Sequence, residues 1–236
     1  MERLLERLRS NLQSMARPEK AQILKRFFKT GPGEYGEGDV FLGIQVPALR
    51  RLARENIELD ESALQSLLRS SVHEERMLSL LILIQQYIQG TDERRRRIYG
   101  IYLANTSFIN NWDLVDVSAE HVMGHFLMRR SRRPLYRLAK SRSLWERRIA
   151  ILATFHFIKR KEFNDTLKIA AILLSDEEDL IQKAVGWMLR EVGKRDLDAE
   201  EQFLRKTYRK MPRTMLRYAI ERFPEEKRKR YLRGDM

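Results

Sequence analysis

The sequence predicts an all-α fold, an α-solenoid of stacked HEAT-like helix pairs with a concave basic face. Three observations carry this prediction: apolar residues at helical spacing, a repeat of about 35 residues, and an excess of basic side chains. The chain contains only 11 Gly and 6 Pro, and no segment alternates in polarity over the length of a strand. Stacking is expected because one helix pair alone leaves its apolar face open.

The helix ends are marked by capping residues and prolines. Roughly ten to twelve helices joined by short turns are expected. Four residues are expected at a helix cap or just before a helix: Asp60, Thr91, Ser141 and Ser175. Three prolines are expected where a helix begins, because a missing N–H costs nothing there: Pro47, Pro134 and Pro212.

An internal repeat supports the helix pairs. Four segments share a polar start, a basic residue and an apolar run: HEERMLSLLILI, LWERRIAILATF, LIQKAVGWMLRE and TMLRYAIERF. Their basic residues, Arg76, Arg148, Lys183 and Arg217, are separated by 72, 35 and 34 residues. Because the first gap is about two periods, a further unit is expected near position 112, where NNWDLVDVSAEHV lies without the basic residue. The repeat predicts one HEAT-like domain over residues 1–236 with no linker.

The charge balance favours a polyanionic partner. The chain has 46 Lys and Arg against 33 Asp and Glu, a net charge of +13. Each cation that meets a phosphate releases a condensed counterion, so nucleic acid fits this excess. The alternative is a soluble protein that is basic without such a partner.

Other sequence classes are excluded or disfavoured. There is no cysteine, which excludes disulfides, thiol nucleophiles and Cys-ligated metals. The amino-terminal MERLLERLRSNLQSM is expected to be an amphipathic helix and not a signal peptide, and no apolar run is long enough to cross a membrane. We therefore expect a cytoplasmic protein, associated with the nucleoid when bound to DNA.

A glycine-rich segment interrupts the helices. Residues 31–38 hold four glycines and one proline and are expected to form a loop. The order of a phosphate-binding P-loop is missing. Two interpretations remain: a surface turn before a helix that Pro47 starts, or a backbone loop that approaches a ligand closely.

The histidines give little support for metal or triad chemistry. His121 and His125 stand four residues apart on one predicted helix, but VMG separates them without the Glu of H-E-x-x-H, and no third ligand is evident. Ordinary surface or packing histidines explain the pair better. No metal and no cofactor are expected.

The segment NNWDLVD at 110–116 is the most informative. Trp112 and Asp116 share a face if it is helical, and Asp113 falls on the first turn, where a carboxylate complements the helix dipole. Asp116 either makes a hydrogen bond between repeats or belongs to a site. Trp187 at helical spacing is either core or site, and Arg148 either forms an internal salt bridge or contacts a phosphate.

Four segments together resemble a known family. FLGIQVP at 41–47, NNWDLVD at 110–116, WERRIAIL at 145–152 and IQKAVGWMLRE at 181–191 are similar to the successive signature segments of AlkD-type DNA glycosylases, in the family's order. The resemblance, with the repeats, covers nearly the whole chain. It implies helix pairs that cradle duplex DNA and excise N3- or N7-alkylated purines, such as 3-methyladenine and 7-methylguanine.

The resemblance also implies residue roles. Trp112 and Trp187 match the family's cleft tryptophans, and Asp116 matches its essential aspartate. The residues expected to contact DNA are Arg148, Phe27, Gln45, Arg50, Lys183 and Arg190. Phe27 stands where the family has a tyrosine, so the aromatic face is kept and the hydroxyl is lost.

These residue types suit a cationic substrate. An alkylated purine is already a good leaving group, so a carboxylate beside the sugar can stabilise the oxocarbenium ion and direct a water. Tryptophan faces attract cations by roughly 0.5–2 kcal/mol each. The expected enzyme is a monomeric, monofunctional glycosylase acting on double-stranded DNA. No lysine is expected to form a Schiff base with the sugar, and Lys183 is the first candidate if one does.

Two other functions use the same charge and repeat. One is a non-catalytic HEAT module that binds nucleic acid, and the other is a scaffold for proteins. The non-catalytic module does not explain why Trp112, Asp116 and Trp187 are present. The protein scaffold requires an acidic partner.

Overall fold

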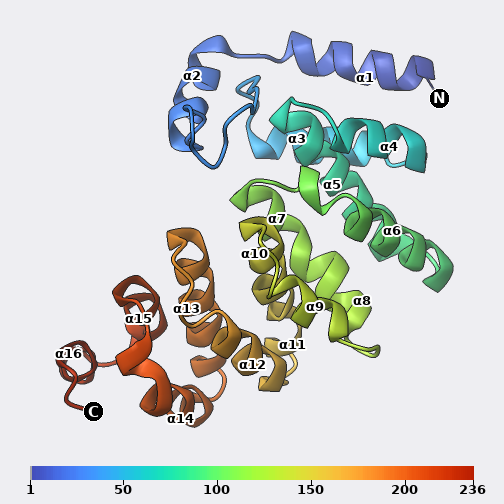
Figure 1. The fold of residues 1–236 in the computed structure, drawn as a ribbon. Helices are drawn as coiled ribbons and strands as arrows, with labels where there is room; N and C mark the ends of the chain where they lie inside the picture. Colours follow the sequence, from blue (N-terminus) through green and yellow to red (C-terminus); the bar gives the residue numbers. More distant parts are fainter. Residues whose placement is uncertain (1) are drawn as a thin grey trace. The chain divides into compact units, whose positions relative to one another are not determined.

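The computed structural model describes residues 2–236, and these residues form helices joined by turns. Within that range the extended pairing is limited to an isolated bridge between Val40 and Val72. The predicted all-α class is confirmed. The chain divides into two compact units, the first ending at Ser118 and the second running from Ala119 to Met236 (Figure 1). The expectation of a single domain over residues 1–236 stays a prediction.

The first unit is built around one long buried helix. Its elements are α1 (Glu2–Ser14), α2 (Pro18–Phe27), α3 (Val46–Glu55), α4 (Glu61–Leu68), α5 (His73–Gln89), α6 (Asp92–Ala104), η1 (Thr106–Phe108) and α7 (Trp112–Ala119). Helices α3, α4 and α6 all pack on α5. Apolar residues on every side of α5, such as Leu78, Leu80 and Ile82, are buried, as expected for a helix surrounded by others.

Polar side chains of α5 satisfy backbone groups of the neighbouring helix turn. Ser79 donates to the carbonyl of Leu64 at 2.7 Å, and Gln86 donates to the carbonyls of Ile57 and Leu59 at 2.6 and 2.7 Å. A buried carbonyl without a partner would cost about 1–3 kcal/mol. These contacts therefore fix the position of α4 on α5.

Several predicted helix starts are confirmed, but Ser141 and Ser175 are not caps, because Ser143 caps α10 and Glu178 precedes α13. Asp60 and Thr91 accept hydrogen bonds from the first-turn amides of α4 and α6. Pro47 and Pro134 lie in the first turns of α3 and α9, and Pro212 directly precedes α15. Local cap chemistry thus sets these boundaries.

The second unit contains two layers of helices. Its elements are η2 (Glu120–Gly124, a π-helical turn), α8 (His125–Leu127), α9 (Arg133–Leu138), α10 (Leu144–Ala153), α11 (Phe155–Ile158), α12 (Asn164–Ile172), α13 (Asp179–Gly193), α14 (Leu197–Thr207), η3 (Tyr208–Lys210), α15 (Arg213–Ala219), η4 (Ile220–Arg222) and α16 (Glu225–Arg233). Helices α10, α13 and α15 pack in sequence as one layer. Helix α9 packs on α10, and α12 and α14 pack on α13, as the other layer (Figure 1).

Close helix packing in the second unit depends on small residues and one buried acid. A Cβ at Gly186 of α13 would lie 2.4 Å from the carbonyl oxygen of Met215 on α15, so only glycine allows this approach. Glu200 of α14 is 1 % exposed, and its carboxylate lies against Gly193 of α13. Its Oε1 has no hydrogen-bond partner.

The sequence predicts no segment long and apolar enough to cross a membrane. Across residues 2–236, every helix is either too short or too polar to span a bilayer.

Candidate functional site

Trp112 is the end of a stack of rings in the first unit. It opens α7 and stacks on Phe28, with ring centroids 5.2 Å apart and planes at 22°. Phe28 stacks on Phe41 at 5.1 Å, and Phe41 stacks on His73 at 4.5 Å. Phe27 meets Trp112 edge-on at 5.8 Å and is 60 % exposed. The structure thus brings together two predicted site residues, Phe27 and Trp112.

The far end of the stack, His73, is held between two carboxylates. Its Nε2 lies 2.8 Å from Asp113 and its Nδ1 3.3 Å from Asp39. Burial acts to lower the pKa of His73, but the hydrogen bonds to Asp113 and Asp39 outweigh burial and raise it above 6.5. Arg76, which donates to Asp39 at 2.7 Å, opposes that rise. Each ring nitrogen thus faces a carboxylate oxygen, an arrangement that favours the protonated imidazole over the neutral one.

Asp39 is the hub of this network. It accepts hydrogen bonds from His73, Arg76 and Asn111, and these bonds outweigh the effect of burial and lower its pKa below 3.8. The Asn111 side chain in turn accepts from the Trp112 amide at 2.8 Å. The Asp39 contribution to stability is lost as pH falls through its folded pKa, and the His73 contribution is lost as pH rises through its own.

The segment FLGIQVP is held by a buried carboxylate. Glu74 accepts from the amides of Leu42, Gly43 and Ile44 at 3.0, 2.8 and 3.2 Å. This arrangement presents Gln45, the residue before α3, to solvent. Arg50 is also exposed, on the next turn of the same helix. The glycine-rich residues 31–38 form turns and do not line the cavity described below.

Gly43 is needed in this loop for two separate reasons. Its φ is +82°, and a Cβ would lie 2.4 Å from the Arg17 carbonyl oxygen. Gly43→Ala should therefore lower the free energy of unfolding by roughly 2–4 kcal/mol, since strain and overpacking add. Gly33→Ala is the matched control, because Gly33 has φ +74° with nothing within 4 Å. Urea unfolding gives the free energy of unfolding of both variants, and the difference between their losses is the contribution of the clash with the Arg17 carbonyl. Equal losses in the two variants would show that this clash costs nothing.

A cavity of about 550 Å³ lies beside the ring stack. Its apolar walls include Ile23 and Phe27 from α2 and Val46 from α3, all partly exposed at its edge. His73 and Asp113 supply polar groups to its lining. The cavity therefore combines an apolar surface with a charged pair.

Asp116 lies one turn after Trp112 on α7 and is half-buried. Burial first, and then the charge of Asp116, raise the pKa of the buried Tyr102 hydroxyl. That hydroxyl pairs with Ser118 Oγ at 2.9 Å. A carboxylate and an indole thus share one helix in a partly dehydrated setting, where charge acts more strongly than in water.

In the second unit, three predicted residues share one face of α13. Lys183, Trp187 and Arg190 are spaced four and three residues apart, as neighbours on a helix surface. Trp187 is half-buried, with its ring 6.0 Å from that of Phe155. Lys183 pairs with Asp179 at 2.6 Å, and Arg190 pairs with Glu221. That Trp187 joins Trp112 and Asp116 in one site stays a prediction.

Arg148 is positioned by its own unit. It is 6 % exposed and donates to the carbonyl of Leu180 at 2.6 Å, joining α10 to the start of α13. This contact is internal to the unit, but it is a hydrogen bond to a backbone carbonyl and not the salt bridge that the sequence offered as the alternative. Its contact with DNA stays a prediction.

Comparison with known proteins identifies the family. The family described as DNA alkylation repair enzyme matches residues 8–223. The chain belongs to this family. No curated protein sequence matches the chain.

Solved structures show the fold of this DNA alkylation repair family member. A predicted DNA alkylation repair enzyme from Enterococcus faecalis has a TM-score of 0.68 at 18 % identity, over 89 % of this chain and 98 % of that one. AlkD2 from Streptococcus mutans has a TM-score of 0.55 at 19 % identity, over 87 % and 99 %. The protein smu.31 from Streptococcus mutans has a TM-score of 0.54 at 19 % identity, over 76 % and 93 %. At these identities the likeness establishes the helical-repeat fold.

One contact of the candidate site could not be seen in the sequence. The sequence predicts a first-turn acid at Asp113, and its Oδ1 does accept from the Leu114 amide at 2.8 Å. Its other oxygen, however, holds His73. The predicted i, i+4 face of His121 and His125 falls across the π-helical turn of η2, and the His125 ring contacts His156 at 5.0 Å.

Proposed function

We propose that the protein is a monofunctional DNA glycosylase that hydrolyses the N-glycosidic bond of N3- or N7-alkylated purines. The observation that carries this proposal is α7, where Asp116 and Trp112 share a face beside a stack of aromatic rings, in a chain of the DNA alkylation repair family. Duplex DNA with alkylated bases is the proposed substrate. We propose that the enzyme acts as a monomer in the cytoplasm, associated with the nucleoid when bound.

The chemistry needs no cofactor. As the C1′–N bond breaks, its electron pair neutralises the cationic purine, which leaves as a neutral base. Water adds at C1′ and loses a proton, giving an abasic site. The Asp116 carboxylate stabilises the oxocarbenium character of the sugar and directs the water, while the Trp112 and Trp187 faces favour positive charge.

The proposed DNA contacts extend this chemistry. Gln45 lines the cavity and is exposed, Arg50 is exposed on α3, and Phe27 presents its ring to solvent beside Trp112. Lys183 and Arg190 lie on either side of Trp187 on α13, and Arg148 supports the start of that helix. Phe27 offers its ring for packing and has no hydroxyl to donate.

The test is release of 7-methylguanine from methylated duplex DNA by the wild-type protein, with a protein-free sample to measure spontaneous loss. The expected products are the free base and an abasic strand that breaks only after alkali. Binding without release would favour the non-catalytic module. Strand cleavage without alkali would contradict monofunctional chemistry and direct attention to Lys183.

A further inference from the structure

The net charge of the protein resides almost entirely in its second unit. Residues 1–118 carry 17 Lys and Arg against 16 Asp and Glu, whereas residues 119–236 carry 29 against 17. Helix α13, which carries proposed contacts of that unit, holds two of these cations, Lys183 and Arg190, and both are paired with acids. Most of the excess therefore lies elsewhere in the unit.

The excess lies in two stretches: residues 205–236, with 12 Lys and Arg against four Asp and Glu, and residues 121–145 around α9, where no acidic residue offsets the cations. Between Glu120 and Glu146 the chain has seven Lys and Arg and no acidic residue. This stretch runs from η2 through α8 and α9 to the start of α10, and both η2 and α9 pack against α10 (Figure 1). Helix α9 buries Leu135 and Leu138 and leaves its basic side chains outward.

The basic side chains of this stretch are mostly unpaired. Arg129, Arg133, Arg137, Lys140 and Arg142 are exposed, and among the described residues none of these side chains has an ion pair or hydrogen-bond partner. In α6 the arginine run differs, because Arg94 and Arg97 both pair with Glu61. Exposed like charges without internal partners attract an external polyanion.

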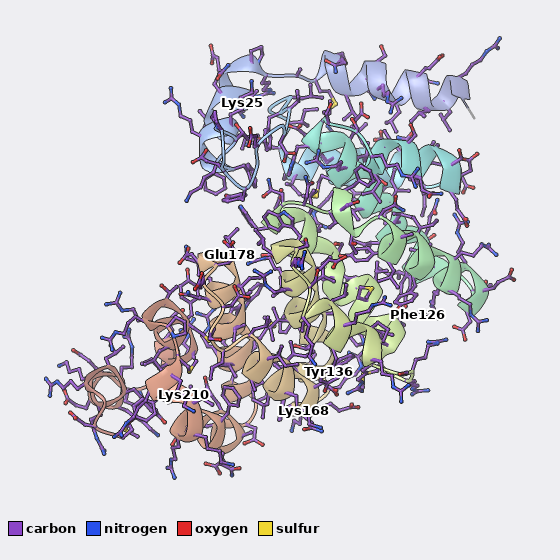
Figure 2. The ribbon with its side chains drawn as sticks, viewed as in Figure 1. Lys25, Phe126, Tyr136, Lys168, Glu178 and Lys210 are labelled. Carbon is purple, nitrogen blue, oxygen red and sulfur yellow. The ribbon has the colours of Figure 1, made fainter. Side chains whose placement is uncertain are left out.

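The surface is held rigidly by its one paired arginine. Arg132 pairs with Glu162 and Asp165, each at 2.5 Å, and lies 4.0 Å over the Phe157 ring. Tyr136 donates to Asp165 at 2.6 Å and ties α9 to α12. Figure 2 labels Tyr136 on α9 and Lys168 on α12, which mark the two joined helices. The cations of α9 thus project from a fixed frame.

We propose that Arg133, Arg137 and Lys140, here called the α9 surface, bind the backbone of a second DNA duplex. The three are spaced four and three residues apart, so they follow one side of the helix and its last turn over about 10 Å. Phosphates recur every 3.4 Å or so along one strand, which allows three contacts over that length. The α9 surface lies in the layer opposite α13, so it leaves the proposed lesion contacts of that helix unoccupied.

Duplex DNA fits this surface better than an acidic protein does. Protein interfaces have an apolar centre, often aromatic. The large apolar side chains exposed on the described chain all lie outside residues 121–145: Ile23, Phe27, Val40, Val46, Ile88, Ile172 and Leu197. A purely cationic surface binds through counterion release and without sequence preference.

The test asks whether the protein can hold two duplexes at once. Undamaged duplex is immobilised, the full-length protein is bound, and capture of a second, fluorescent undamaged duplex is measured at several salt concentrations. The variant is Arg133→Gln/Arg137→Gln/Lys140→Gln. The matched control, Lys206→Gln/Lys210→Gln/Arg233→Gln, removes three exposed, unpaired charges from the same unit.

Wild type and control are expected to capture the second duplex, and the α9 variant to lose capture at least tenfold. In the α9 variant, the slope of log binding constant against log salt for the second duplex should be smaller than in wild type by about 2.7, which corresponds to three phosphate contacts. Release of 7-methylguanine should be unchanged in all three proteins. Equal capture by the α9 variant, or no capture by wild type at low salt, would overturn the proposal. Polyglutamate serves as a probe for an acidic protein. If the α9 variant lost polyglutamate binding and kept DNA capture, the surface would be assigned to an acidic protein.

Discussion

Replacing Asp116 with asparagine is expected to slow release of 7-methylguanine at least about 100-fold, the loss typical of removing one preorganised electrostatic group. Asparagine keeps the size of the side chain and removes its charge, so the oxocarbenium ion loses its counterion. The half-buried position of Asp116 strengthens that effect, because water screens the charge less there.

Single-turnover release at saturating protein measures the chemical step apart from binding. Asp92→Asn is the control, since Asp92 is 79 % exposed by side chain and pairs only with Arg95 of its own helix. That control should release the base at the wild-type rate, and thermal melting establishes that each variant is folded. Equal rates for Asp116→Asn and wild type would remove Asp116 from the mechanism.

Replacing Glu200 with glutamine should stabilise the protein, and the gain should grow with pH. Burial, and then the charge of Glu201, raise the pKa of Glu200 from 4.5 to about 8, although Arg190 and Lys227 act to lower it. Between these two pKa values, folding therefore takes up a proton. The loss of wild-type folding stability that this causes is absent below pH 4.5, rises with pH and levels off above about pH 8. At one pKa unit per 1.4 kcal/mol, the gain reaches roughly 3–5 kcal/mol at alkaline pH.

Denaturant unfolding of both proteins from pH 4 upward to about 9 tests this sign. The neighbouring Glu201→Gln is expected to act oppositely, because Glu201 pairs with Lys227 and Arg205 and glutamine would leave those cations unmatched. A constant difference between Glu200→Gln and wild type at every pH would show that folding does not raise the pKa of Glu200.

The sequence predicted the helices well because their signals are local. Asp60 and Thr91 cap the helices that follow them, and the four repeat segments fall on α5, α10, α13 and α15. Such patterns need only a few neighbouring residues, so they can be interpreted without the fold. The period could not show, however, that contacts divide the chain near Ser118.

The site was predictable only where its residues lie close in sequence. Trp112 and Asp116 share α7, and Lys183, Trp187 and Arg190 share α13, as their spacing indicates. The pairing of His73 with Asp39 and Asp113 joins residues 34 and 40 positions apart through an irregular loop. No periodicity encodes such a contact, because it depends on the tertiary position of the loop.

The uneven distribution of charge implies that affinity for DNA and discrimination between intact and alkylated DNA reside in different units. The first unit is nearly neutral, so the contribution to DNA binding that we propose for Trp112 and the ring stack should depend little on counterions. In the same proposal the second unit supplies the attraction that salt weakens for every sequence alike. Raising the salt should therefore weaken binding to intact and to alkylated DNA by similar factors, so that both affinities fall while their ratio changes little.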